Sequence, residues 1–119
     1  MEKIFLEVYK DLHNSGYKEE DPLKRFLFNT KQHAILIFYI SSLSEKKSTL
    51  EDICYNISPK VISRSTVQNI LKEGVKINFL IKEINKKDKR AKYFKLSEAA
   101  EKIMLNWIDH RKELFSQLK

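Results

Sequence analysis

A helical pattern of apolar residues gives way directly to two short β-type segments in the second half of this 119-residue chain. The pattern follows Ser63, a residue type that commonly caps a helix N-terminus. Its apolar members recur at helical spacing: Val67, Ile70, Leu71 and Ile77. The segments 79–84 and 91–96 are rich in β-branched and aromatic residues, and the stretch between them is polar and highly charged. This order predicts a helix over 63–77 that leads into a β-hairpin with a basic tip.

A second short helix is expected immediately before this unit. Ser48 and Glu51 have the spacing of a capping box, with Ser48 as the cap. The apolar residues that follow share one helical face: Leu50, Ile53, Cys54 and Ile57. This helix should end before Pro59. Two short helices in succession, the second with a polar face, are typical of a helix-turn-helix.

Four further helices complete the predicted order. Apolar residues at helical spacing predict an amphipathic helix over 3–14, and Asp21-Pro22 has the form of an N-cap and first position for a short second helix. Thr30 can cap a third helix over 31–43. This third helix should be buried, because its middle is apolar almost all round. Ser97 is expected to cap a long last helix that runs to about residue 118.

These elements together predict a mainly α chain with a small β-hairpin, an α+β fold of the winged helix-turn-helix type with helical arms at both termini. The length suits a single domain. Its expected parts are an N-terminal dimerisation arm over 1–29, a core over 30–97 and a C-terminal dimerisation helix over 98–119. The last helix carries an apolar stripe whose first residue is Ala100. This apolar surface is larger than a lone domain of this size can easily cover. A homodimer is therefore expected, with these residues at its interface: Ile4, Phe5, Val8, Ile103, Trp107, Leu114 and Leu118.

The positive charge is concentrated in one third of the chain. The net charge is +7, while residues 60–95 contain eleven Lys or Arg and three Asp or Glu, which gives +8 for this stretch and −1 for the rest. Concentration of this kind on one structural unit favours a polyanionic partner. A solvated basic face without any partner is the alternative.

The predicted helix 63–77 is suited to the major groove of double-stranded DNA. Its N-terminal backbone N–H groups favour a phosphate, and Arg64 can contact a phosphate or a guanine. Gln68 and Asn69 carry the paired donor and acceptor that match adenine. The full set of expected DNA contacts on this helix is Ser63, Arg64, Ser65, Thr66, Gln68, Asn69, Lys72 and Lys76. The alternative is the solvent face of an ordinary helix.

The hairpin tip makes a separate argument for DNA binding. Asp88 can accept a hydrogen bond from Arg90 and so stiffen the tip, which would let Arg90 enter a narrow minor groove. The other cations of the tip would meet flanking phosphates: Lys86, Lys87, Lys89 and Lys92. A charged, solvated hairpin tip is again the alternative.

Several classes of site are not expected. Cys54 is the only cysteine and is predicted to be a buried, inert thiol. The three histidines, His13, His33 and His110, have no metal-ligand spacing, and no nucleophile, phosphate-loop or paired-carboxylate motif is present. No metal, cofactor or enzymatic activity is therefore predicted. The longest apolar run, 34–40, is far shorter than the roughly 20 residues of a membrane span, so we expect a cytoplasmic protein.

From residue 30 to about 105 the chain resembles the MarR family of winged-helix regulators. Three motifs are similar to those of the family: Thr30, Gln32, Ile35 and Leu36 at its first buried helix, residues 63–67 at its recognition helix, and Asp88, Arg90, Phe94, Leu96 and Ser97 at its wing. The resemblance implies a dimer in which the terminal helices of two chains intertwine. The family often binds small phenolic ligands, but no residue here matches a defined ligand motif, so a small-molecule effector stays open without support from the sequence.

The sequence therefore predicts a homodimeric, DNA-binding transcription regulator that reads the major groove with residues 63–77 and the minor groove with residues 85–92. Two alternatives stay open. One is a DNA-binding protein of replication or of plasmid or phage maintenance, which nothing in the sequence separates from a regulator. The other is a winged helix used for protein–protein contact, which would not need the concentrated positive charge.

Overall fold

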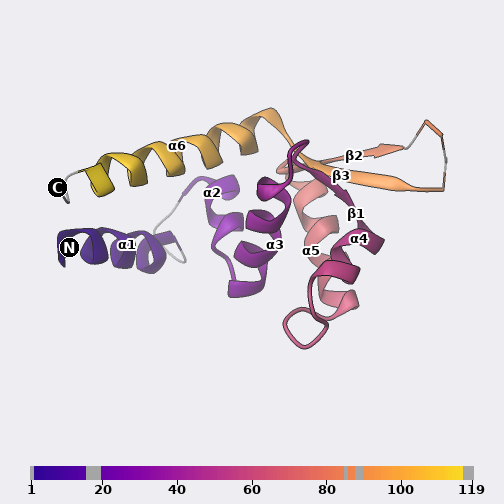
Figure 1. The fold of residues 1–119 in the computed structure, drawn as a ribbon, viewed down its shortest axis with the longest axis horizontal. Coiled ribbons are helices and arrows are strands. Elements are labelled where there is room, and N and C mark those ends of the chain that lie inside the picture. Colours follow the sequence, from indigo (N-terminus) through magenta and orange to yellow (C-terminus); the bar gives the residue numbers. More distant parts are fainter. Residues whose placement is uncertain (1, 16–19, 85, 88–89, 117–119) are drawn as a thin grey trace.

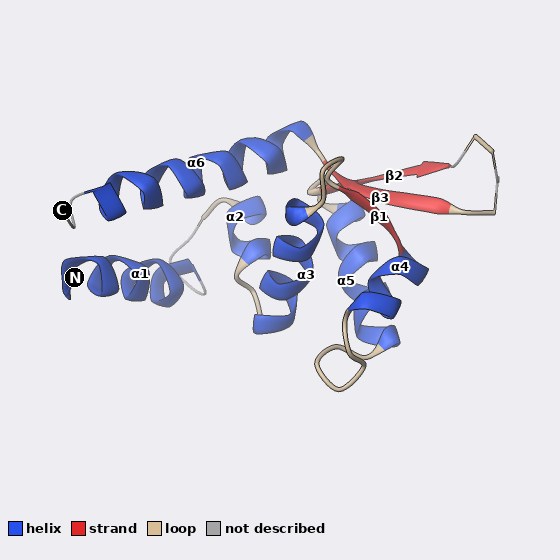
Figure 2. Ribbon diagram, in the orientation of Figure 1, coloured by secondary structure: helices blue, strands red, loops and turns tan. Residues whose placement is uncertain are grey.

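The computed structural model describes residues 2–15, 20–84, 86–87 and 90–116. In these ranges the chain is mostly helical, with a small three-stranded antiparallel sheet (Figures 1 and 2). The elements in chain order are α1 (Glu2–Ser15), α2 (Pro22–Leu27), α3 (Lys31–Ser42), β1 (Lys47–Thr49), α4 (Leu50–Asn56), α5 (Arg64–Lys76), β2 (Leu80–Ile84), β3 (Lys92–Leu96) and α6 (Glu98–Ser116). None of the helices in the described ranges is both long and apolar enough to cross a membrane.

Four of the helix starts confirm the capping residues expected from the sequence. The Asp21 carboxylate accepts a hydrogen bond from the Leu23 N–H at 2.9 Å, with Pro22 at the first helical position. Thr30 and Ser63 accept from the backbone N–H three residues ahead in α3 and α5. At the start of α6, the Ser97 hydroxyl accepts from the Ala100 N–H at 3.1 Å. Each cap satisfies a backbone donor that the helix itself leaves without a partner.

The predicted start of the fourth helix is wrong. Thr49, not Ser48, caps α4, and its hydroxyl accepts from the Asp52 N–H at 3.1 Å. Ser48 instead lies in β1, a strand that the sequence did not predict, where it is buried opposite Phe94 of β3. The Ser48 hydroxyl donates to the Thr49 carbonyl at 3.3 Å, and Thr49 takes the capping position, so the capping box does not form.

The sheet has the strand order β1–β3–β2, with β3 antiparallel to both neighbours. Leu80 of β2 pairs with Leu96 of β3 at the base of the hairpin, and both are buried. Because side chains alternate across a strand, Lys82, Phe94 and Lys92 lie on the same face as this leucine pair. The hairpin β2–β3 projects away from the helices beyond its base (Figure 2).

The core centres on α3, as the apolar middle of that helix predicts. Leu36, Ile37 and Ile40 have no measurable exposure. Val67, Ile70 and Leu71 of α5 are buried as expected, whereas Ile77 is only partly buried. The remaining core residues come from every other element except α1 and β1: Phe26, Leu27, Ile53, Ile57, Ile62, Phe79, Leu80, Leu96, Ala100 and Met104.

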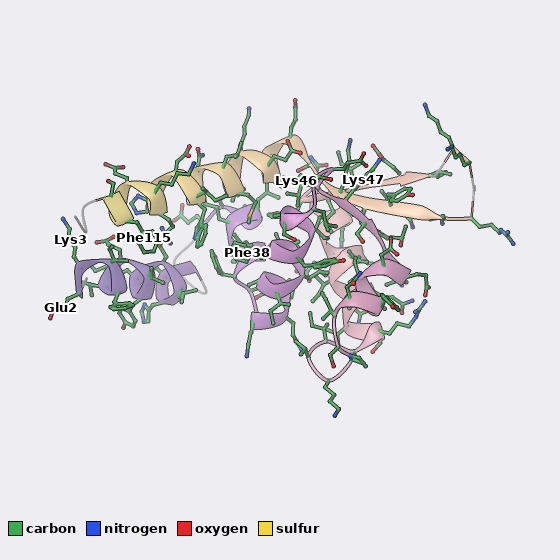
Figure 3. All side chains as sticks on the ribbon, viewed as in Figure 1. Glu2, Lys3, Phe38, Lys46, Lys47 and Phe115 are labelled. Atoms are coloured by element: carbon green, nitrogen blue, oxygen red, sulfur yellow. The ribbon has the colours of Figure 1, made fainter. Side chains whose placement is uncertain are left out.

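The two terminal helices run antiparallel beside each other and extend away from the core (Figure 1). Arg111 of α6 is buried and forms a hydrogen-bonded ion pair with Asp11 of α1. Its guanidinium also lies 4.6 Å from the centre of the Trp107 ring. Phe38 of α3, labelled in Figure 3, belongs to the same cluster. Its ring centre lies 5.2 Å from that of the tryptophan. These contacts join both arms to the core.

The buried face of α6 differs in part from the predicted stripe. Ala100 is buried as expected, but Met104 and Arg111, which were not in the stripe, are also buried. Ile103 and Trp107 are partly buried. The side chain of Leu114 and all of Leu118 lie outside what the structure describes. In α1, Ile4 is buried within its own chain and Val8 is partly buried, while Phe5 is exposed.

Candidate nucleic-acid interface

The solvent-facing side of α5 carries most of the residues that the sequence assigned to DNA contact. These are all exposed: Arg64, Ser65, Gln68, Asn69, Lys72 and Lys76. The opposite side of the helix is buried through Val67, Ile70, Leu71 and Gly74. A helix fixed to the core on one side and polar on the other can present its polar side to a partner without rearrangement.

The hydroxyls of Ser63 and Thr66 are hydrogen bonded to each other at the start of α5. The Ser63 hydroxyl accepts from the Thr66 N–H at 3.3 Å and donates to the Thr66 hydroxyl oxygen at 2.9 Å. The Ser65 hydroxyl lies 3.3 Å from the same Ser63 oxygen. Ser63 and Thr66 therefore help to build the helix start, and Ser65, which is exposed, is the one of these three hydroxyls that is better placed for a partner.

Arg64 is paired with an acidic residue of the neighbouring helix. Its Nη1 donates to Oε2 of Glu51 at 3.2 Å, and its Nη2 donates to Oε1 of the same carboxylate. The hydrogen bonds and the charge of Arg64 lower the pKa of Glu51 below its ordinary range, so this carboxyl is ionised at neutral pH. The pair links the first turn of α4 to the first turn of α5. Glu51 is a site residue that the sequence analysis did not assign.

A groove of about 610 Å³ separates α5 from the hairpin. Apolar side chains from α4, α5 and β3 line it: Leu50, Leu71, Val75 and Phe94. Four positively charged residues also line it: Lys72 of α5, Lys82 of β2, and Arg90 and Lys92 at the β3 side of the hairpin. Gln68 and Glu51 contribute to the polar lining. The fold thus brings cations from two separate elements to one concave surface.

Lys82 is a further groove residue that the sequence analysis did not assign. Its ammonium lies 5.8 Å from the centre of the Phe94 ring, directly across the β2–β3 pairing. Strand alternation could have indicated it, because Lys82 lies two residues from buried Leu80 on the same face. On the other face of the hairpin, Lys95 is paired with Glu83 at 2.9 Å. The hydrogen bond from Lys95 lowers the pKa of Glu83, so this pair is neutral overall.

The hairpin tip is described only in part. Lys86, Lys87, Arg90 and Lys92 are exposed. Asp88 and Lys89 lie outside the described residues, and so does the expected hydrogen bond between Asp88 and Arg90. Lys76 and Asn69 are exposed on α5 but do not line the groove. The structure therefore brings Gln68 and Lys72 together with Arg90 and Lys92, while Asn69, Lys76 and the other described residues of the assigned set lie outside the groove lining.

Two sites outside this surface bear on the sequence predictions. Cys54 is partly buried on the inner face of α4, not fully buried. His33 is buried at the start of α3, where its Nδ1 lies 2.7 Å from the Thr30 hydroxyl and its Nε2 lies 3.1 Å from a Glu73 carboxylate oxygen of α5. Across the described ranges, no three His, Cys, Asp or Glu side chains converge to hold a metal ion.

The chain matches no family model, and no curated protein or solved structure is significantly similar to it.

Proposed function

We propose that residues 30–97 form a winged helix-turn-helix that binds double-stranded DNA. The observed order α3–β1–α4–α5–β2–β3 supports this, because it places two short helices before a hairpin and adds a third strand that anchors the hairpin. In this proposal α5 is the recognition helix and the hairpin β2–β3 is the wing. B-DNA's major groove, about 12 Å wide, admits one such helix.

The observation that carries the proposal is the groove between α5 and the hairpin. Lys72 approaches it from α5, and Lys82, Arg90 and Lys92 approach it from the hairpin. A sugar-phosphate strand that passed between a recognition helix and a wing would meet cations from both. A basic surface without a partner gives no reason for α5 and the hairpin both to place cations in the same groove.

A homodimer is the second part of the proposal. Apolar side chains on the arms remain exposed although the arms contact each other: Phe5, Leu6, Tyr9 and Leu12 of α1, and Leu105, Ile108 and Phe115 of α6. Exposed apolar surface of this extent at one end of a molecule is typical of an interface. A second copy is the fitting partner, because a two-fold dimer presents two recognition helices to two half-sites. Occupancy of such a site near a promoter would regulate transcription, as the resemblance to MarR regulators implies.

The direct test measures the equilibrium binding of the intact protein to short DNA duplexes. Fluorescence anisotropy reports the binding at each of several salt concentrations. If each protomer neutralises about four to five phosphates, the slope of log K against log salt should lie near −7 to −9 for a dimer. A slope near zero, or no binding to any duplex, contradicts the proposal and favours a protein partner.

A matched pair of variants locates the binding surface. Lys72→Ala with Lys92→Ala removes two positive charges from the groove, and Lys102→Ala with Lys112→Ala removes two from exposed positions on α6. The groove variant should flatten the salt slope by about one unit for each phosphate that it no longer neutralises. The α6 variant should leave the slope close to that of the unmodified protein. Equal effects of the two variants would show that net charge, not the groove, governs binding.

A further inference from the structure

Arg64 lies where the electrostatics of its own helix disfavour it. It is the first residue of α5, and the N-terminal end of a helix carries partial positive charge that repels a cation. The Glu51 carboxylate, from the first turn of α4, offsets this repulsion by hydrogen bonding both terminal nitrogens of the guanidinium. The pair is nonetheless on the surface, since the Arg64 side chain is 52% exposed and that of Glu51 is 74% exposed.

The geometry of the pair leaves one edge of the guanidinium available. A guanidinium carries five N–H donors in a rigid planar fork. Glu51 binds end-on, taking one donor from Nη1 and one from Nη2. Glu51 does not take a donor from Nε, so the edge formed by Nε–H and the adjacent N–H is a second edge that carries two parallel donors. Two parallel donors match the O6 and N7 acceptors on the major-groove edge of guanine.

We infer that Glu51 is a positioning residue that holds Arg64 to read one guanine in each half-site of the DNA. This inference rests on the proposed function, because it assigns a base to the N-terminal end of the same recognition helix. Gln68 follows Arg64 by four residues, so the two lie one turn apart on the same side of α5. Arg64 thereby joins the base-reading surface of the helix.

A guanine suits this arrangement better than a phosphate does. A phosphate next to Arg64 would also lie next to the ionised Glu51 carboxylate, and like charges repel. A guanine edge is uncharged overall and accepts the two donors without that repulsion. A flexible arginine also needs no brace to find a phosphate, whereas bidentate recognition of a base depends on the orientation of the guanidinium plane.

The test uses duplexes selected from a randomised pool by the intact protein. In the selected duplex, each guanine is replaced in turn by 7-deazaguanine, which keeps Watson–Crick pairing but lacks the N7 acceptor. Three variants are compared with the unmodified protein: E51Q, R64K and E83Q. E83Q is the matched control, because it also removes one carboxylate from an exposed ion pair, the Glu83–Lys95 pair on the far face of the hairpin.

The expected result is one guanine per half-site whose replacement weakens binding by about 10- to 150-fold, the range for losing one hydrogen bond to a charged donor. R64K should abolish that sensitivity, since an ammonium cannot make the planar pair. E51Q should reduce it by about two- to fivefold, in keeping with the modest strength of an exposed ion pair. E83Q should leave it unchanged. Thermal unfolding of each variant verifies that the fold is intact.

Two results would overturn the inference while leaving DNA binding in place. In one, E51Q and E83Q tighten binding to every duplex alike and preserve the guanine sensitivity, which would make Glu51 a counter-charge only. In the other, no guanine depends on Arg64. Failure of the intact protein to bind any duplex would be a different outcome, and it would overturn the proposed function together with this inference.

Discussion

Replacement of Gly74 by alanine tests the packing between α5 and the hairpin. Gly74 lies inside α5 and is buried, and a Cβ added there would be 2.7 Å from Leu80 Cδ1 and 3.0 Å from Leu80 Cγ. It would also be 3.2 Å from Cζ of Phe26. Both neighbours are core residues with almost no exposure, so neither side chain can move out into solvent. The missing Cβ lets α5 approach β2 this closely.

Two effects of opposite sign decide the magnitude. Alanine is a better helix former than glycine by about 1 kcal/mol, whereas an extra methyl in a packed core costs about 1–3 kcal/mol. We therefore expect Gly74→Ala to lower the free energy of unfolding by about 1 kcal/mol. Leu80→Ala alone should cost about 2–5 kcal/mol. In the Leu80→Ala background the contact with Leu80 is gone and Phe26 can shift by a few tenths of an ångström into the space left, so Gly74→Ala should then raise the free energy of unfolding by up to about 1 kcal/mol.

The assay is denaturant unfolding of the four proteins of this double-mutant cycle at one fixed protein concentration, because the unfolding of a dimer depends on concentration. The reversal of sign between the two backgrounds is the diagnostic result. Gly74→Ala that stabilises the otherwise unmodified protein would refute the reasoning. So would an equal destabilisation in both backgrounds, since the contact with Leu80 would then not be the cause.

Three further outcomes are expected. Asp11→Asn should lower the free energy of unfolding by about 1–3 kcal/mol, less than the loss of a fully buried ion pair, because Asp11 is partly exposed. It should also speed amide hydrogen exchange in α1. Unchanged exchange would show that the pair with Arg111 does not hold α1 in place. Ile108→Glu, which places a charge on the exposed apolar side of α6, should shift sedimentation from dimer to monomer, and a dimer that persists would place the interface elsewhere. Gln68→Ala should weaken the binding free energy by about 1–3 kcal/mol on the selected duplex and by much less on random DNA. Lys86→Ala should weaken binding to the selected duplex and to random DNA about equally. If Gln68→Ala also weakens binding to both kinds of DNA equally, α5 does not read bases.

The helix starts could be predicted because their causes are local. Thr30, Ser63 and Ser97 each accept a hydrogen bond from a backbone N–H only three residues ahead. The boundary therefore depends on a few consecutive residues that the sequence displays directly. The two hairpin strands were predicted for a similar reason, since β-branched runs on either side of a charged turn form a local unit. Both observed strands begin one residue later than predicted.

The third strand could not be predicted because its cause is distant. Residues 47–49 are Lys-Ser-Thr, without an apolar pattern, and they become a strand by pairing with β3 more than forty residues later. Leu96 also donates its N–H to the Lys46 carbonyl at 3.2 Å, which extends the pairing. That pairing turned Ser48 inward and moved the cap of α4 to Thr49. Here the hydrogen bonds between distant strands, and not the local capping motif, determined where Ser48 lies.

The same distinction explains the candidate site. The exposed side of α5 follows from helical periodicity, so its residues were identified from the sequence. The Glu51–Arg64 pair depends on how α4 and α5 cross, and in the sequence Glu51 alone resembles an ordinary acidic residue at a helix start. Lys82 belongs to the groove only because the hairpin lies opposite α5.

The arms show how one charged residue changes the expected interface. In the sequence pattern Arg111 falls beside the apolar stripe of the last helix, yet it is buried between Trp107 and Asp11. A buried guanidinium is costly unless it is paired, so the pairing with Asp11 fixes which side of α1 faces α6. Ile4 precedes Asp11 by two helical turns on that inner side, and it is buried. The opposite side of α1, with Phe5 and Tyr9 exposed, is what remains for a second copy. Dimerisation through the arms should therefore use the outward side of an α1–α6 pair already formed within each chain.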